Sequence, residues 1–220
     1  MKKIQIVSFI FLLLFFSGCL VRSIHPFFTD EDIVFDEAIL GQWYDEDSLS
    51  WQISRYEHIG GFLDNSAESD DSYRLEFIDD EGRKNIFNAH LFRLGDSLYF
   101  DFCPLFEDGL EDSFYSYHLV PSHSLARLSF LSDKKMIIKW FHEEWLRELL
   151  SEDRVKIKHE VFSRNPLLQT ESYLLTASTE DLQKFILKYA DHPEAFDADG
   201  KPLNEDGRDE NVLEVVLTRE

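Results

Sequence analysis

Apolar and polar residues alternate in a series of short runs that begins near residue 51 and reaches the end of the chain. The runs are rich in β-branched and aromatic residues, and a period of two is typical of a strand with one buried face. We therefore predict strands at 51–57, 73–79, 85–94, 97–103, 123–131, 136–141, 155–162, 173–178 and 211–219.

The segments between these runs have the composition of tight turns. Asp79–Arg83 reads DDEGR, 94–97 reads LGDS and 131–135 reads LSDKK. Because short connections join antiparallel neighbours, we expect a mainly β protein built as an antiparallel up-and-down meander of about nine strands. Closure into a barrel would remove the exposed edges that such a meander otherwise presents.

Two stretches have helical rather than strand periodicity. Residues 142–153 and 178–193 each place apolar side chains on one face and charged side chains on the other. Ser178 stands where a helix N-cap is expected, and Pro193 stands where the second helix should have ended. We expect both helices to pack on the barrel.

The first residues of the chain have a different pattern. Lys2 and Lys3 precede an apolar segment at 4–16, which is too short to span a bilayer. Ser17 and Gly18 are small residues at its end. This order is typical of a secretory signal peptide, so we expect the protein to be exported.

The order Phe16-Ser17-Gly18-Cys19 resembles the lipobox of bacterial lipoproteins, although leucine is more usual where Phe16 stands. The resemblance implies that Cys19 is lipidated and becomes the first residue of the mature chain. The alternative is an ordinary signal peptide followed by a free cysteine. Leu20 follows, with no acidic residue that would resemble an inner-membrane retention signal, so the outer membrane is favoured where the cell has one.

These features divide the chain into three parts. Residues 1–18 are a signal peptide, 19–38 a lipid-anchored tether with a short helical turn, and 39–220 a single β-barrel-like domain.

Gly41-Gln42-Trp43, which follows the expected helical turn, resembles the first-strand motif of lipocalins. In that family the tryptophan packs at the closed end of the barrel against an arginine from a late strand, and Arg219 is the residue that matches this arginine. The resemblance implies a lipocalin-like barrel. The alternative is a core tryptophan such as begins any half-buried strand.

Charge and composition narrow the range of partners. The chain has 43 Asp and Glu residues against 22 Lys and Arg, a formal net charge of −21. Such a surface repels nucleic acid and anionic lipid headgroups, so neither is expected to bind. Aromatic residues make up 15% of the chain, which is enough for a dense core.

No common catalytic motif occurs in the sequence. Four histidines could in principle supply zinc ligands, but their spacing fits no standard site; they are His90, His118, His123 and His159. We expect them to have structural roles, and we expect no metal or cofactor. Cys103 is expected to be buried and inert. Asp101 with Glu76 or Glu160 is a candidate for paired carboxylates inside the barrel; the alternative is that these acids form salt bridges on exposed faces.

We expect a lipid-anchored envelope lipoprotein that is not an enzyme and that binds a small apolar ligand in its barrel. The aromatic alternation in 86–94 and 97–102 would line the cavity; the alternative is that these aromatic side chains fill the barrel. The alternative is a structural or assembly lipoprotein that binds another envelope protein through an exposed surface, for which the aromatic stretch 111–121 is the candidate.

Overall fold

The computed structural model of the protein describes residues 20–57, 71–79, 82–105, 114, 116–165, 170–196 and 214–219. The expected signal peptide and Cys19 lie outside these residues. Within them the strands form one sheet of eleven strands, which closes on itself through an additional pairing of β6 (Ser97–Pro104) with β7 (His123–Ser132).

Eight of these strands form a closed antiparallel barrel, which confirms the predicted fold class. Each strand pairs with the next along the chain as far as β8, and β11 inserts between β8 and β2 to close the wall. The eight strands are β2 (Gly41–Tyr44), β3 (Ser50–Arg55), β4 (Tyr73–Ile78), β5 (Lys84–Leu94), β6 (Ser97–Pro104), β7 (His123–Ser132), β8 (Lys135–Trp140) and β11 (Glu214–Thr218).

Three further strands lie beside the barrel: β1 (Arg22–Ser23), β9 (His159–Asn165) and β10 (Thr170–Leu175). The last pairing of β8 with β7 is that of Trp140 with Ala126, and the first residues of β7 pair with β1 instead. β1 in turn pairs in parallel with β10, which pairs with β9. Of the runs predicted in the meander at 155–162 and 173–178, residues 159–162 and 173–175 lie in this extension of the wall, and 155–158 and 176–178 are not in strands.

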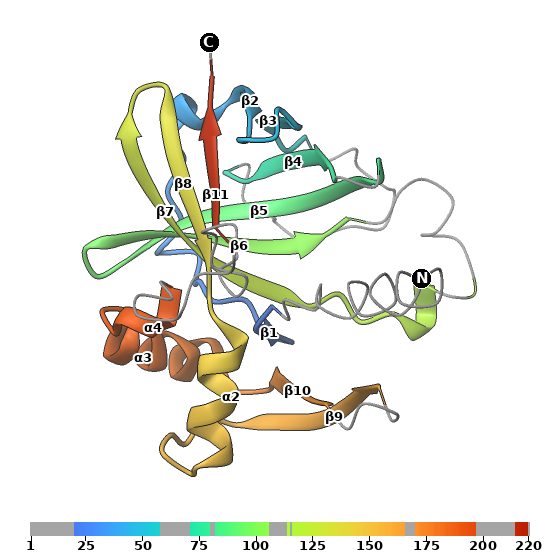
Figure 1. The fold of residues 1–220 in the computed structure, drawn as a ribbon, viewed down its shortest axis with the longest axis vertical. Helices are drawn as coiled ribbons and strands as arrows, with labels where there is room; N and C mark the ends of the chain where they lie inside the picture. The colour runs from blue at the N-terminus through green and yellow to red at the C-terminus, as the bar shows by residue number, and fades with distance from the viewer. Residues whose placement is uncertain are drawn as a thin grey trace, which may run out of the picture.

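The helices are short and gather with β9 and β10 below the barrel in Figure 1. They are α2 (Glu143–Ser151), α3 (Thr179–Tyr189) and α4 (Pro193–Phe196), with 3-10 turns η1 (Glu37–Ile39) and η2 (Ser116–His118) elsewhere. The Ser178 hydroxyl accepts a hydrogen bond from the Asp181 N–H (3.4 Å), so Ser178 caps α3 as predicted. In the part of the chain that the structure describes, no helix has the length and apolar character needed to cross a bilayer.

Two hydrophobic cores share the wall formed by β5, β6 and β7. The first fills the barrel and takes inward-facing side chains from all eight strands, among them Trp43, Phe100 and Leu217. The second lies outside the barrel, where outward-facing residues such as Phe92 and Tyr99 pack against the helices. Alternation along β5 and β6 therefore separates one core from the other, and both faces of this wall are apolar.

The segment at 20–28, for which the sequence predicted a tether, is packed into the second core. Val21 is 2% exposed and Phe27 is 1% exposed, and Arg22–Ser23 form β1. Leu20 makes an isolated backbone bridge with His142, at the start of α2. The described residues are thus part of the folded domain from Leu20 onward.

Closure by β11 can be tested at Leu217, whose side chain is completely buried in the barrel core. Replacing Leu217 with Ala should lower the free energy of unfolding by about 2–5 kcal/mol, because the smaller side chain leaves a cavity that the rigid wall cannot fill. Urea unfolding followed by tryptophan fluorescence measures the loss. Leu187→Ala, at an exposed position, is the control, and equal losses in the two variants would contradict the arrangement.

Candidate functional site

One end of the barrel is closed by η1. Trp43 lies under this turn and donates a hydrogen bond from its indole Nε1 to the Ile39 carbonyl oxygen (2.8 Å). The Arg219 guanidinium lies over the Trp43 ring, 4.7 Å from the ring centroid, and donates to the Ala38 carbonyl oxygen (2.9 Å). Gly41 begins β2 with φ of +128°, a conformation that favours glycine. The structure therefore brings the three residues of the lipocalin-like motif together at this closed end.

Tyr73 ties the chain preceding η1 to the barrel. Its hydroxyl accepts a hydrogen bond from the Asp36 N–H (2.6 Å) and donates to the Asp36 carbonyl oxygen (3.1 Å). Phe35 stacks on its ring at 4.7 Å between centroids, and the Arg55 guanidinium lies over Phe35. Burial raises the pKa of Tyr73 to about 12, so the phenol keeps its proton, and the bond that it donates to Asp36, to a higher pH than an ordinary tyrosine would.

The opposite end of the barrel, here called the mouth, is ringed by aromatic side chains. Trp51 stacks on Phe77 (4.4 Å between centroids), Phe77 on Phe87 (6.0 Å), and Phe87 meets Phe102 edge to face (5.9 Å). Phe102 stacks on Trp140 (5.6 Å), and Trp140 returns to Trp51 (6.5 Å). These five residues, from β3, β4, β5, β6 and β8, form a closed circuit that we call the aromatic collar.

The collar has a buried inner side and an accessible outer side. Trp51 and Phe102 are buried, whereas Phe77, Phe87 and Trp140 are half-buried and pack against the edge of the barrel core. Beneath the collar the barrel is filled by side chains that are almost completely buried, such as Ile53, Leu75 and Phe100. Among these residues, solvent therefore reaches parts of Phe77, Phe87 and Trp140, while the side chains beneath them fill the interior.

Asp45 holds the collar to the neighbouring turn. One of its carboxylate oxygens accepts hydrogen bonds from the N–H groups of Asp47 (3.0 Å) and Leu49 (2.8 Å). The other accepts from the Trp51 indole Nε1 (3.4 Å). The acidic run at 44–48 thus has a structural role at the mouth, because its first carboxylate orders the turn and positions one collar ring.

Asp101 is a buried carboxylate on the outer face of the barrel wall. It is 0% exposed. One oxygen accepts a hydrogen bond from the Phe27 N–H (2.8 Å), and the other lies 2.7 Å from the His123 Nδ1. His90, opposite Asp101 on β5, stacks on Phe28, and burial lowers its pKa although Asp101 opposes the shift. Asp101 therefore fastens the N-terminal segment to β6 and β7.

The other sequence candidates do not join this cluster. Glu76 pairs with Arg74 (2.6 Å) and Lys84 (2.8 Å), and Glu160 is an exposed residue of β9, so neither meets Asp101. His118 contacts Phe114 and His159 contacts Tyr173. In the described residues no group of three or more His, Cys, Asp or Glu side chains is placed to hold a metal ion.

Cys103 was expected to be buried, but it is half-buried. It lies on the outward face of β6, opposite Asn88, because the barrel alternation places Phe102 inward. The expectation relied on its apolar neighbours in sequence, and those neighbours point to the other side of the wall.

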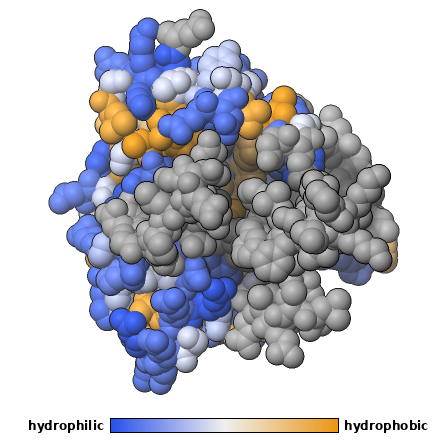
Figure 2. Space-filling view, in the orientation of Figure 1, coloured by the Kyte–Doolittle hydropathy of each residue, from blue (hydrophilic) through white to orange (hydrophobic). Residues whose placement is uncertain are grey.

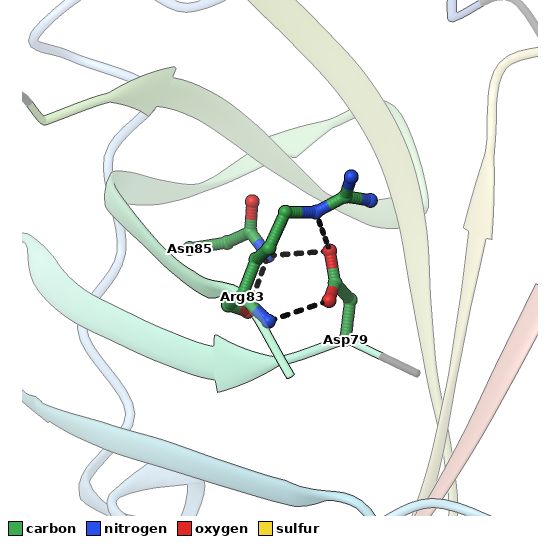
Figure 3. Close-up of polar contacts among 3 residues, drawn as sticks. All are labelled: Asp79, Arg83 and Asn85. Atoms are coloured by element: carbon green, nitrogen blue, oxygen red, sulfur yellow. Dashed lines mark hydrogen bonds and ion pairs between the residues drawn. The ribbon is translucent and has the colours of Figure 1, made fainter. Parts of the chain in front are cut away.

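A second acidic residue that the sequence assigned to a loop, Asp79, also has a structural role (Figure 3). Its carboxylate accepts hydrogen bonds from the Arg83 N–H (2.8 Å), the Arg83 Nε (2.9 Å) and the Asn85 Nδ2 (3.5 Å). The bond from the Arg83 backbone is the main cause of a lowered pKa for Asp79. This acid closes the turn between β4 and β5.

The collar was not found from the sequence, although its members occupy predicted strands. Alternation shows that Phe87 and Phe102 share the inward face, but only the strand register shows that five rings meet in a circuit.

Comparison with known proteins gives no matching family model, no matching curated protein and no matching solved structure.

The role of Asp101 can be tested by Asp101→Ala. We expect a loss of about 1–3 kcal/mol in unfolding free energy for each buried donor that is left without an acceptor. Asp101→Asn, which keeps an acceptor oxygen, should lose less. The matched control is Asp79→Ala, which removes a carboxylate with a similar set of bonds at the protein surface and should cost less than Asp101→Ala. Equal destabilisation at the two positions, measured by urea unfolding, would contradict a special role for Asp101.

Proposed function

We propose that this protein is a lipid-anchored lipoprotein of the cell envelope that performs no catalysis and binds a small apolar ligand at the aromatic collar. The collar carries the proposal, because it presents several half-buried aromatic rings at one end of a barrel whose other end is closed. An eight-stranded barrel has an interior that is filled by side chains or holds one small ligand. Here buried side chains fill the interior, so the ligand would contact the collar rings at its end.

The chemistry of the collar favours a neutral, flat or branched apolar molecule. Aromatic rings bind such groups by stacking and by edge-to-face contact, in addition to the gain from burying apolar area. No ring of the collar carries a charge, and the nearby Asp45 carboxylate already accepts hydrogen bonds from the turn and from Trp51. A strongly charged ligand would thus lose hydration at the collar without gaining a partner.

The membrane anchor is proposed from the lipobox-like sequence that ends at Cys19. Lipoproteins of this kind carry two or three acyl chains on the cysteine, and two chains are enough for stable anchoring. Since Val21 is already buried in the domain, a lipid on Cys19 would hold the folded domain directly against the membrane surface. We place the protein in the outer membrane where the cell has one.

A second candidate function rests on a different observation. Phe114 (77% exposed), Tyr117 (84%) and Val120 (76%) lie between β6 and β7, at the same end of the barrel as the collar. Clustered exposed apolar side chains mark sites of protein interaction. This patch falls in the stretch 111–121 that the sequence singled out, and it favours an envelope protein as partner.

Ligand binding at the collar can be measured with N-phenyl-1-naphthylamine, a neutral aromatic dye that fluoresces in apolar sites. The protein beginning at Leu20 keeps all described contacts. We expect excitation of tryptophan to transfer energy to the bound dye. Trp140→Phe should reduce this transfer and leave the part that comes from Trp51, the other tryptophan of the collar. Phe87→Leu should weaken binding by about three- to tenfold, the equivalent of one aromatic contact.

Trp145→Phe is the matched control, because Trp145 belongs to the second core and not to the collar. It should leave dye binding unchanged. If the dye does not bind, or if Trp145→Phe reduces transfer as much as Trp140→Phe, the collar is not the site. Crosslinking of an envelope protein through a photoreactive residue at Tyr117 would then support the second candidate.

Lipidation can be tested on the full chain expressed in a bacterium supplied with radioactive palmitate. We expect label on the wild-type protein, retention of the label in Cys103→Ser and its loss in Cys19→Ser. The two variants change the only two cysteines of the chain, so each controls for the other. Label that persists in Cys19→Ser would exclude the anchor at this position.

A further inference from the structure

A groove of about 340 Å³ lies outside the barrel, between α3 and the extended segment that precedes β9. Val155 and Ile157 supply its wall from the segment, and Phe185 and Tyr189 supply it from the helix. Val155, Ile157 and Phe185 are buried members of the second core. The apolar side chains that line the groove therefore belong to the folded core as well.

The segment is held at both ends by backbone hydrogen bonds. The Arg154 N–H donates to the Leu149 carbonyl oxygen at the end of α2 (2.9 Å), and the Thr176 N–H donates to the Lys158 carbonyl oxygen (2.9 Å). Between these points the side chains alternate, with Val155 and Ile157 inward and Lys156 exposed. The groove is thus bounded on one side by a fixed strand-like segment.

The rim of the groove is positively charged. Lys156 and Lys158 come from the segment, and Lys184 and Lys188 come from successive turns of α3. Asp181 is the one acidic residue of the lining, and it pairs with Lys184 (3.0 Å). Among the described residues, no carboxylate forms a salt bridge with the other three lysines.

This arrangement is unusual for a chain of net charge −21. The chain has eleven lysines, and four of them surround this groove. Figure 2 shows hydrophilic residues over most of the described surface in the lower part of the molecule, where the helices lie. A local excess of positive charge around the apolar wall of the groove is complementary to a molecule that combines a negatively charged head group with an apolar chain.

We propose that the groove binds an anionic amphiphile, a molecule with one phosphate or carboxylate head and a short alkyl chain. The lysines bind the head, and the chain lies along Val155, Ile157 and Phe185. A volume of about 340 Å³ is within the range of small-ligand sites. An inorganic anion would leave the apolar side chains of the groove in water. A neutral chain would leave Lys156 and Lys158 without an anionic partner among the described residues, whereas Lys184 already pairs with Asp181 and Lys188 lies 4.8 Å from the centroid of the Tyr189 ring. This site is separate from the collar and differs from it in the charge of its ligand.

The test is lysine footprinting of the full chain held in zwitterionic nanodiscs. Limited acetylation followed by mass spectrometry gives the reactivity of each lysine with and without octyl phosphate. We expect Lys156, Lys158 and Lys188 to be protected, while Lys134 and Lys135 on the barrel are not. Lys156→Glu combined with Lys188→Glu should weaken the protection of Lys158 about tenfold in apparent affinity, as the loss of two exposed charge contacts predicts.

The matched control is Lys134→Glu combined with Lys135→Glu, which makes the same change of net charge at the β7–β8 turn and should leave protection of the groove unchanged. Octyl phosphate, inorganic phosphate and octanol are compared at equal concentrations. Equal protection by inorganic phosphate would reduce the groove to an anion site, and equal protection by octanol would reduce it to an apolar site. Either result, or protection by none of the three, overturns the proposal.

Discussion

Closure of the barrel by its last strand is the constraint on which the rest of the structure depends. β11 pairs with β8 over five residues and with β2 through Thr218, so the end of the chain joins the first and last strands of the meander. Without this strand two edges would be exposed, which soluble β proteins avoid. Closure also places Arg219 over Trp43 and so links the C-terminal residues to η1 at the closed end.

A closed barrel has only one inner face, and this explains why the second core lies outside. β5, β6 and β7 carry apolar residues on both faces, and their outward rows need a cover. The helices and the segment at 20–28 provide that cover. Asp101 is a completely buried carboxylate on this face, and its burial is acceptable because the Phe27 N–H and the His123 Nδ1 lie within hydrogen-bonding distance of its two oxygens.

Most of the fold could be predicted from the sequence because it depends on local pattern. Period-two alternation located the barrel strands from β3 to β8 and β11, and the Ser178 cap located α3. The partners of β9 and β10 could not be predicted, since alternation shows which face is buried and not which strand lies next to it. They depend on β1, a strand of two residues that is too short to give a periodic signal. The collar and the groove depend on the same long-range register.

The net charge of the chain and the charge around one site are also different properties. Net charge describes the field at long range, and salt screens that field beyond about 8–10 Å. At shorter range the arrangement of individual side chains decides what binds. In this protein Asp45, Asp79 and Asp101 accept hydrogen bonds from neighbouring residues. Four lysines line one groove: two are spaced by four residues on a helix and two by two residues on an extended segment, so each pair shares one face of its element. An acidic chain can therefore contain a site for an anion, and its composition alone does not exclude one.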